Sequence, residues 1–206
     1  VKDFSAEKFK MHLTSDEVNV IEILPGGVVT KKAAAHIQLD ENGEFVRNPK
    51  EDLVKVAVVE RHQGTGNVAC GFLKGYGIKE GAVALSVAHD SHNIIVVGVN
   101  DEEMEFAVNS LIAQEGGIVL VKEGKVIEQM PMPIAGLMSD QSGEWVDEKL
   151  TSIHEKAYTE LGICGDVEPV MTLCFMSLAV IPEIKLTDMD LSDVTTFSFI
   201  PVEISR

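Results

Sequence analysis

Short apolar runs, separated by polar or glycine-containing segments, constrain the fold of this chain more than any other feature. Three of them, at residues 54–59, 82–88 and 94–99, are rich in β-branched and small apolar side chains. Such runs, bounded by turn residues, are typical of buried β-strands. The Asn42-Gly43 pair follows an extended segment at residues 28–39 and predicts a type I′ hairpin turn with two positive φ angles. Because a hairpin pairs its strands antiparallel, we expect a sheet that is not purely parallel.

Two segments show the apolar spacing of amphipathic helices. After Asn100, apolar residues recur at i, i+3, i+4, i+7 and i+8, and Asn100 and Glu103 have the spacing of a capping box. A second stripe follows Ser142, a predicted N-cap, and stops before Gly162, where a left-handed C-cap is expected. Strands interspersed with helices predict an α/β or α+β fold, with a mixed sheet and at least two amphipathic helices.

A polar, proline-containing segment at residues 48–52 predicts a connection between two parts of the chain. We therefore expect a small β-rich segment at residues 1–50 and a larger α/β unit at residues 51–206. Within the larger unit, six glycines between residues 64 and 81 indicate tight backbone conformations. The apolar run at residues 170–181 is expected in the core, and residues 195–204 form the last predicted strand.

Charge and cysteine content exclude several classes of protein. The chain has 17 Lys and Arg against 33 Asp and Glu, a net charge of −16, so its surface repels nucleic acid. No run approaches the ~18 apolar residues that span a bilayer, so no membrane partner is expected. The first residues lack both Met and a signal-peptide pattern, and we expect the chain to begin within a longer protein. Three widely spaced cysteines, Cys70, Cys164 and Cys174, predict buried free thiols and a cytoplasmic location.

The strongest polar cluster is His89-Asp90-Ser91-His92-Asn93, which lies between the predicted strands at residues 82–88 and 94–99. Two imidazoles and a carboxylate held by a rigid frame can act as ligands or proton-transfer groups. The alternative is a plain hairpin loop, whose Asp, Ser and Asn side chains bond to their own turn while the histidines are solvated. Spacing alone does not separate the two.

A second cluster, Glu60-Arg61-His62, ends the strand at residues 54–59 and runs into the glycine-rich stretch. Its side chains can converge on whatever the glycines approach, although charged residues at strand ends are often only solvated. The remaining histidines are isolated and receive no role, and Asp188 and Asp190 fit a solvated loop better than a cation site. The chain has no phosphate-binding loop, nucleophile elbow, zinc helix or zinc deaminase motif. Its Gly75-x-Gly77 pattern has a third glycine one residue too late for a dinucleotide fingerprint.

Five sequence blocks, in this order, resemble the C-terminal region of bacterial-type adenine deaminases. They lie at residues 56–62, 71–75, 86–98, 133–140 and 181–188. The resemblance covers about the last 150 residues, and five ordered blocks are far more specific than any one of them. Members of this family are metal-dependent amidohydrolases that convert adenine to hypoxanthine and ammonia. They contain a TIM-type barrel, a small β-sandwich and an extra C-terminal α/β domain.

The resemblance implies that this chain is the C-terminal portion of such an enzyme without the barrel. Residues 1–50 would then resemble the closing strands of the β-sandwich, and residues 51–206 the C-terminal domain. The divalent metal of the family, expected to be manganese, is bound in the barrel by ligands that include a His-x-His pair. No two histidines of this chain have that spacing, so we expect no metal or other cofactor in it and no activity from it alone.

Under this interpretation the two polar clusters face the mouth of the barrel. His89, Asp90 and His92 are assigned accessory catalytic roles in orienting the substrate or relaying protons. Substrate binding is assigned to a second set, namely Glu60, Arg61, His62, Ser91 and Asn93. The expected partners are adenine, the barrel of the same protein and further copies of the enzyme in a homo-oligomer.

Two other hypotheses remain open from the sequence. In the first, the chain is a non-catalytic lid or oligomerisation module, and the histidine loop only shapes a wall. In the second, it is an autonomous metal hydrolase that uses His89, Asp90 and His92 as ligands in an open site.

Overall fold

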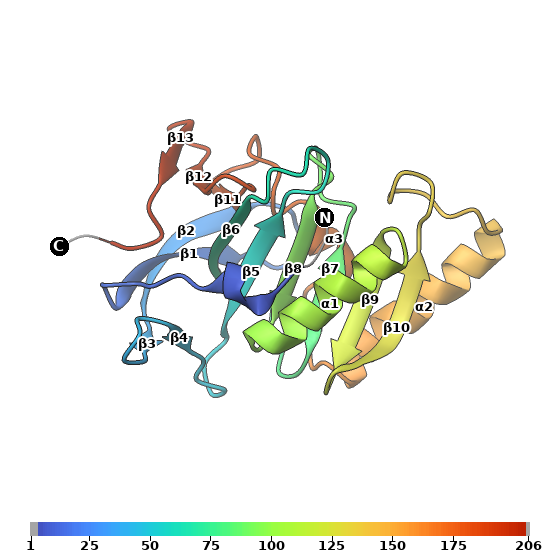
Figure 1. Ribbon diagram of the computed structural model, residues 1–206, viewed down its shortest axis with the longest axis horizontal. Helices are drawn as coiled ribbons and strands as arrows, with labels where there is room; N and C mark the ends of the chain where they lie inside the picture. Colours follow the sequence, from blue (N-terminus) through green and yellow to red (C-terminus); the bar gives the residue numbers. More distant parts are fainter. Residues whose placement is uncertain (1–3, 205–206) are drawn as a thin grey trace.

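An eight-stranded mixed sheet forms the centre of the computed structural model, which describes residues 4–204 (Figure 1). The strand order is β10-β9-β7-β8-β5-β6-β1-β2, and every neighbouring pair is antiparallel except β1 and β6. The strands of this sheet are β1 (Glu17–Ile23), β2 (Thr30–His36), β5 (Leu53–Val59), β6 (Val68–Lys74), β7 (Ala82–Leu85), β8 (Ile94–Gly98), β9 (Gly117–Lys122) and β10 (Lys125–Pro131). The predicted mixed sheet and α/β class are confirmed.

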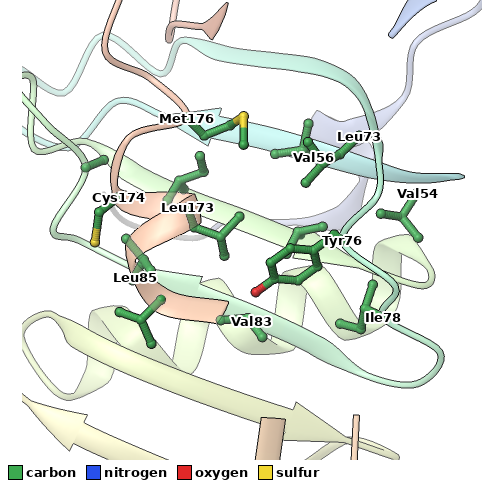
Figure 2. Close-up of a cluster of buried hydrophobic side chains, with 14 of the residues drawn as sticks. Val54, Val56, Leu73, Tyr76, Ile78, Val83, Leu85, Leu173, Cys174 and Met176 are labelled. Atoms are coloured by element: carbon green, nitrogen blue, oxygen red, sulfur yellow. The ribbon is translucent and has the colours of Figure 1, made fainter. Parts of the chain in front are cut away.

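Both faces of the sheet are covered, which explains the continuous apolar strands. Alternate residues of β5 belong to different clusters: Val54, Val56 and Val58 point to one side, and Ala57 and Val59 to the other. Helix α1 (Asp101–Ala113) packs on the second side, as Figure 1 shows, and α2 (Gly143–Thr159) and α3 (Pro169–Cys174) pack on the first. Figure 2 shows the first side, where Tyr76 is fully buried and its hydroxyl donates to the carbonyl of Pro169 at 2.8 Å.

The predicted helix caps are present. Asn100 Oδ1 accepts from the backbone N–H of Glu103 at 2.8 Å, and Ser142 Oγ accepts from that of Trp145 at 3.3 Å. The capping box of α1 is incomplete because Glu103 Oε1 accepts instead from the N–H of Gly124. Gly162 takes a φ of +70° just beyond the end of α2, in agreement with the expected left-handed residue.

The sheet continues across the predicted boundary near residue 50. β1 pairs with β6 and β2 pairs with β1, so residues before the boundary extend the sheet built by residues after it. Residues 38–46 form a separate hairpin of β3 (Gln38–Leu39) and β4 (Phe45–Val46). The assignment of residues 1–50 to a β-sandwich stays a prediction.

Two local predictions are wrong in detail. Only Gly43 of the Asn42-Gly43 pair has a positive φ, so the turn is not type I′; Asp40 Oδ1 bonds instead to the N–H groups of Asn42 and Glu44. The tight backbone predicted between residues 64 and 81 is confirmed, since five of its six glycines have a positive φ, but this stretch also contains β6, which the sequence did not predict. Cys164 is exposed, whereas Cys174 is buried and Cys70 partly buried.

The C-terminal region also differs from the prediction. Only five residues of the apolar run at 170–181, residues 170–174, are helical. Met171 is 55% exposed because a short helix lying on a sheet buries one side only, and Val180, in a turn after α3, is 66% exposed. The predicted last strand is reduced to β13 (Ser198–Ile200), since Asp193 accepts from the backbone and hydroxyl of Thr195 and turns the chain there. β13 completes a three-stranded sheet with β11 (Ile184–Leu186) and β12 (Leu191–Asp193).

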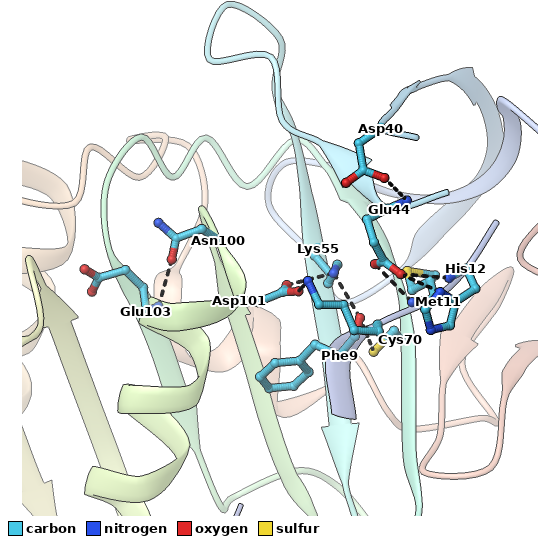
Figure 3. A network of polar contacts seen from close by, with 11 residues as sticks. Phe9, Met11, His12, Asp40, Glu44, Lys55, Cys70, Asn100, Asp101 and Glu103 are labelled. Carbon is cyan, nitrogen blue, oxygen red and sulfur yellow. Dashed lines mark hydrogen bonds and ion pairs between the residues drawn. The ribbon is translucent and has the colours of Figure 1, made fainter. Parts of the chain in front are cut away.

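A polar network closes the end of the sheet where β5 begins (Figure 3). Lys55 is only 5% exposed, and its Nζ donates to Asp101 Oδ1 at 2.7 Å and to the carbonyl of Phe9 at 3.0 Å. Phe9 ends the short 3₁₀ helix η1 (Ala6–Phe9), so this network ties the N-terminal segment to β5 and α1. Among residues 4–204, no helix has the length and apolar character needed to cross a bilayer.

Candidate functional site

The two polar clusters predicted from the sequence lie at the opposite end of the sheet from the Lys55 network. β5, β7 and β10 end there, and β6, β8 and β9 begin there, so their connections gather at one edge (Figure 1). We call this surface the loop edge; it comprises residues 60–67, 86–93, 114–117, 132–139 and 174–177.

The structure joins the two predicted clusters. The backbone N–H of Arg61 donates to Asn93 Oδ1 at 3.3 Å, and Arg61 Nε donates to the carbonyl of His92 at 2.5 Å. His62 Nε2 lies 2.8 Å from the carbonyl of Ser91 and 3.1 Å from that of His92, so this nitrogen carries the ring proton and donates. Segments 30 residues apart therefore form one polar surface.

Arg61 links a third segment to this surface. Its Nη2 donates to the carbonyl of Ala135 at 2.8 Å, and a Cβ at Gly136 would lie only 3.0 to 3.2 Å from the guanidinium atoms. Gly136 also has a φ of +74°, so glycine is needed here for space and for backbone conformation. Within residues 4–204 no carboxylate forms an ion pair with Arg61, and burial lowers the pKa of its guanidinium. Arg61 thus presents a positive charge with no internal counter-ion.

Glu60 is directed into its own loop. Its carboxylate accepts from the N–H groups of Gln63 at 2.7 Å and Thr65 at 2.9 Å, and also from that of His62. These hydrogen bonds, led by the one from Gln63, outweigh burial and lower the pKa of Glu60 to about 2. The side chain holds the loop after β5, and its predicted role in substrate binding stays a prediction.

His89 is fixed through its main chain. Its N–H donates to the carbonyl of Cys174 at 2.7 Å, and its carbonyl accepts from Ser177 Oγ at 3.3 Å. Its ring lies against Phe175, with 4.7 Å between the centroids. Asp90 and Ser91, which follow it, are exposed.

His92 has an unusual backbone and an unusual ring. Its φ is +53°, a region that non-glycine residues seldom adopt, and its N–H donates to the carbonyl of Ala88 at 2.6 Å. Burial, followed by the charges of His89 and Arg61, lowers the pKa of the imidazole below its ordinary value of 6.5. The ring is therefore neutral at pH 7. Its Nδ1 is buried and has no hydrogen-bond partner among residues 4–204.

The buried hydroxyl of Ser86 connects two other segments of the loop edge. This hydroxyl donates to the carbonyl of Gly136 at 2.5 Å and accepts from the N–H of Gly117 at 2.8 Å. A cavity of about 160 Å³ lies beside it, lined by Arg61, Ser86, Ile94, Leu111, Ile112, Glu115 and Gly116. The sequence blocks that contain Ser86 and Gly136 carry the family resemblance, but no role followed from them. Phe175 was missed because its apolar neighbours placed it in the core.

The residues of the loop edge do not fit a metal site. Within residues 4–204, no three His, Cys, Asp or Glu side chains lie close enough together to hold an ion. This finding argues against the hypothesis of an autonomous hydrolase with His89, Asp90 and His92 as ligands. The other histidines pair elsewhere: His12 with Glu44, His36 with Asp16 and His154 with Glu168.

Comparisons with known proteins identify the family of this chain. The model of the adenine deaminase C-terminal domain family matches residues 27–198. Adenine deaminase 2 of Desulfotalea psychrophila is 67% identical over 203 residues, covering 98% of this chain and 35% of that protein. Adenine deaminase of Ligilactobacillus salivarius is 49% identical over 204 residues, covering 99% of this chain and 35% of the relative.

The chain therefore spans about a third of the length of the curated relatives that it matches. The family match includes both polar clusters and all three loops that Arg61 joins. By this match, the chain belongs to the adenine deaminase C-terminal domain family.

Proposed function

We propose that this chain works as part of an enzyme that hydrolyses adenine to hypoxanthine and ammonia, and that its loop edge faces the catalytic barrel supplied by the rest of that enzyme. The observation that carries the proposal is the convergence of Arg61 and His62 on the main chain of residues 91–92, within the region matched by the family. Such convergence holds polar side chains of several loops on one rigid surface.

The chemistry of deamination gives these side chains a task. The amino group leaves adenine C6 as ammonia and must be protonated, and a neutral imidazole can accept a proton from the attacking water and pass it to that group. His92 is neutral at pH 7, and His62 and His89 lie on the same surface. We assign proton transfer and substrate orientation to this group of histidines, with Asp90 as an exposed carboxylate beside them.

Metal dependence is proposed for the parent enzyme and not for this chain. The loop edge does not offer three ligands, so the divalent metal, manganese by resemblance, would be bound by the barrel. We also propose that the parent enzyme is a cytoplasmic homo-oligomer and that this chain alone is inactive.

A lid function is a second candidate, favoured by one observation. The loop that Arg61 binds carries two exposed apolar side chains, Ile134 at 46% and Met138 at 57% exposure. Exposed apolar side chains on an ordered loop suit contact with another part of an enzyme. In this case the loop edge would cover the barrel without taking part in the reaction.

The test uses a full-length chimera, in which this chain replaces the matched third of the Desulfotalea psychrophila relative. Ammonia release from adenine is measured with added Mn²⁺ for the chimera and for this chain alone. We expect activity only from the chimera. Turnover by the chain alone would refute the proposal that this chain needs the catalytic barrel.

Alanine variants then distinguish a catalytic role of the loop edge from the lid function. We expect His89→Ala and His92→Ala to lower kcat/KM of the chimera about tenfold, whereas His36→Ala, on β2 away from the loop edge, leaves it unchanged. If both loop-edge variants stay within about twofold of the unmodified chimera, the lid function replaces the catalytic one.

A further inference from the structure

Three aromatic rings lie next to one another at the loop edge, and only two of them belong to the polar cluster predicted from the sequence. His89 is in the middle: its ring centroid is 4.7 Å from that of Phe175, with 45° between the ring planes, and 5.8 Å from that of His92, with 68° between the planes. All three side chains are partly exposed, so each residue contacts both protein and solvent. We call these residues the ring row.

The ring row is held by main-chain bonds to distant segments. His89 bonds on both sides to residues 174–177, the segment that also carries Phe175. The carbonyl of His92 accepts from Arg61 and lies within reach of His62 Nε2. The rings are therefore placed by β5, β7 and α3 together and need no ligand to order them.

The hydrogen-bonding state of His92 follows from its surroundings. A buried N–H without an acceptor is costly, and an unprotonated ring nitrogen without a donor is less so. Since Nδ1 is buried and unpartnered, the proton of the neutral ring belongs on Nε2. Any ligand that bonds to this ring meets an N–H donor and no charge.

These properties select a class of ligand. Flat heteroaromatic rings stack on aromatic side chains, and purine rings present acceptor nitrogens at their edges. A carboxylate or phosphate would gain less from a neutral imidazole than from a cation, and the guanidinium of Arg61 is already engaged with two carbonyls. The surface fits an uncharged, planar nitrogen heterocycle.

We propose that the purine ring of the substrate stacks on the ring face of Phe175, beside His89 and His92, and that Phe175 is a substrate-binding residue. The inference rests on the proposed function, because adenine is the planar heterocycle that the parent enzyme would deliver to this edge. It goes further by naming a contact residue and the ring face as what is recognised.

The experiment measures purine binding and turnover by the full-length chimera. Phe175→Leu removes the ring and keeps an apolar side chain of similar size; Phe175→Tyr keeps an aromatic face. Phe199→Leu is the matched control, since Phe199 is 53% exposed on β13, outside the ring row. Binding of hypoxanthine, which the enzyme does not turn over, is followed by equilibrium dialysis, and KM and kcat are measured with adenine.

We expect Phe175→Leu to raise the Kd of hypoxanthine and the KM of adenine together, each about tenfold, with kcat within twofold. Phe175→Tyr and Phe199→Leu should stay within about twofold of the unmodified chimera in both constants. Equal loss in Phe175→Leu and Phe199→Leu, or no change in Phe175→Leu, overturns the stacking proposal.

The failure of the two proposals can be told apart. A chimera that binds hypoxanthine through Phe175 but does not deaminate adenine refutes the proposed function and keeps the stacking surface. A chimera that deaminates adenine equally well with Phe175→Leu keeps the proposed function and refutes the stacking surface. A chimera that binds no hypoxanthine refutes the stacking surface outright.

Discussion

The two ends of β5 each hold a cation, and the two cations are satisfied in different ways. At one end Lys55 is buried and bonded to the carboxylate of Asp101 and the carbonyl of Phe9 (Figure 3). Past the other end, Arg61 is half-buried, and among residues 4–204 its guanidinium bonds only to the carbonyls of His92 and Ala135. The first charge is neutralised within the fold, and the second is not.

From this difference we assign a structural role to one end of β5 and a functional role to the other. A buried pair such as Lys55 and Asp101 fixes the position of η1 and α1, and losing either partner leaves an uncompensated charge. The guanidinium of Arg61 bonds to the carbonyls of two other loops and keeps its charge in a chain whose net charge is −16. We infer that the Lys55 end stabilises the fold and that the loop edge is kept for binding.

The largest effect is expected for Lys55→Ala. The change removes the bond to Phe9 and leaves Asp101, whose side chain is only 13% exposed, without its closest cation. We expect the free energy of unfolding, measured in urea, to fall by about 3 kcal/mol.

Lys50→Ala is the control, because Lys50 is exposed, and it should change the same quantity by less than about 0.5 kcal/mol. A loss below about 1 kcal/mol for Lys55→Ala would contradict the inference that the Lys55 end of β5 stabilises the fold.

Lys185 extends the comparison to a buried cation with no carboxylate pair among residues 4–204. It is fully buried in β11, its Nζ donates to the carbonyl of Val28 at 2.7 Å, and burial lowers its pKa to about 8. Replacing it with the apolar Met in Lys185→Met should raise the unfolding free energy at pH 7 by about 1 to 2 kcal/mol. A net loss would show that the bond to Val28 outweighs the cost of burying the charge.

The same lysine predicts a pH dependence with a definite sign. Between pH 8 and the ordinary pKa of 10.5, the unfolded chain keeps its proton on Lys185 while the folded chain loses it. The unfolded state then binds more protons, so this group makes stability rise with pH across that window. The rise, taken from urea unfolding at several pH values, should disappear in Lys185→Met.

At the loop edge we expect activity to change more than stability. Arg61→Ala removes the bonds that connect residues 89–93 and 133–139, and should lower kcat/KM of the full-length chimera about tenfold. The unfolding free energy of the chain should fall by only about 1 kcal/mol, since the freed carbonyls lie near solvent. Arg61→Lys keeps the charge but not the two-pronged geometry, and full activity in that variant would assign the effect to charge alone.

The smallest effect concerns the titration of His92. Burial and the charge of His89 lower its pKa, so its ring should titrate by NMR with a midpoint below 6.5. Folding therefore favours the neutral ring, and this contribution to stability is lost as the pH falls below 6.5. His89→Ala should move the midpoint upward; an unchanged midpoint would leave burial as the whole cause.

Local patterns predicted the elements that depend on neighbouring residues. The apolar runs at β5, β7 and β8 and the caps Asn100 and Ser142 are confirmed. β6 was hidden because glycine has low strand propensity, and it exists here because β5 and β1 pair with it on either side. No local pattern contains that information.

The candidate site was also predicted only in part from the sequence. The sequence singled out residues 60–62 and 89–93 by their polar character and suggested the family through five ordered blocks. It gave no sign that Arg61 would bond to the carbonyls of His92 and Ala135, because main-chain acceptors look the same at every position. Phe175 is a further case, since an aromatic residue in an apolar run is usually core.

The sequence by itself determined the strands β5, β7 and β8, the helices α1 and α2, the polar clusters and the resemblance to the adenine deaminase C-terminal domain, since these depend on side-chain type and spacing. Only the tertiary structure decided that β1 and β2 join the main sheet, that Lys55 is paired and Arg61 is not, and that three rings meet at the loop edge. The physical reason is that pairing, burial and ring contacts depend on residues far apart in the chain, and their positions are set only when the strands have packed.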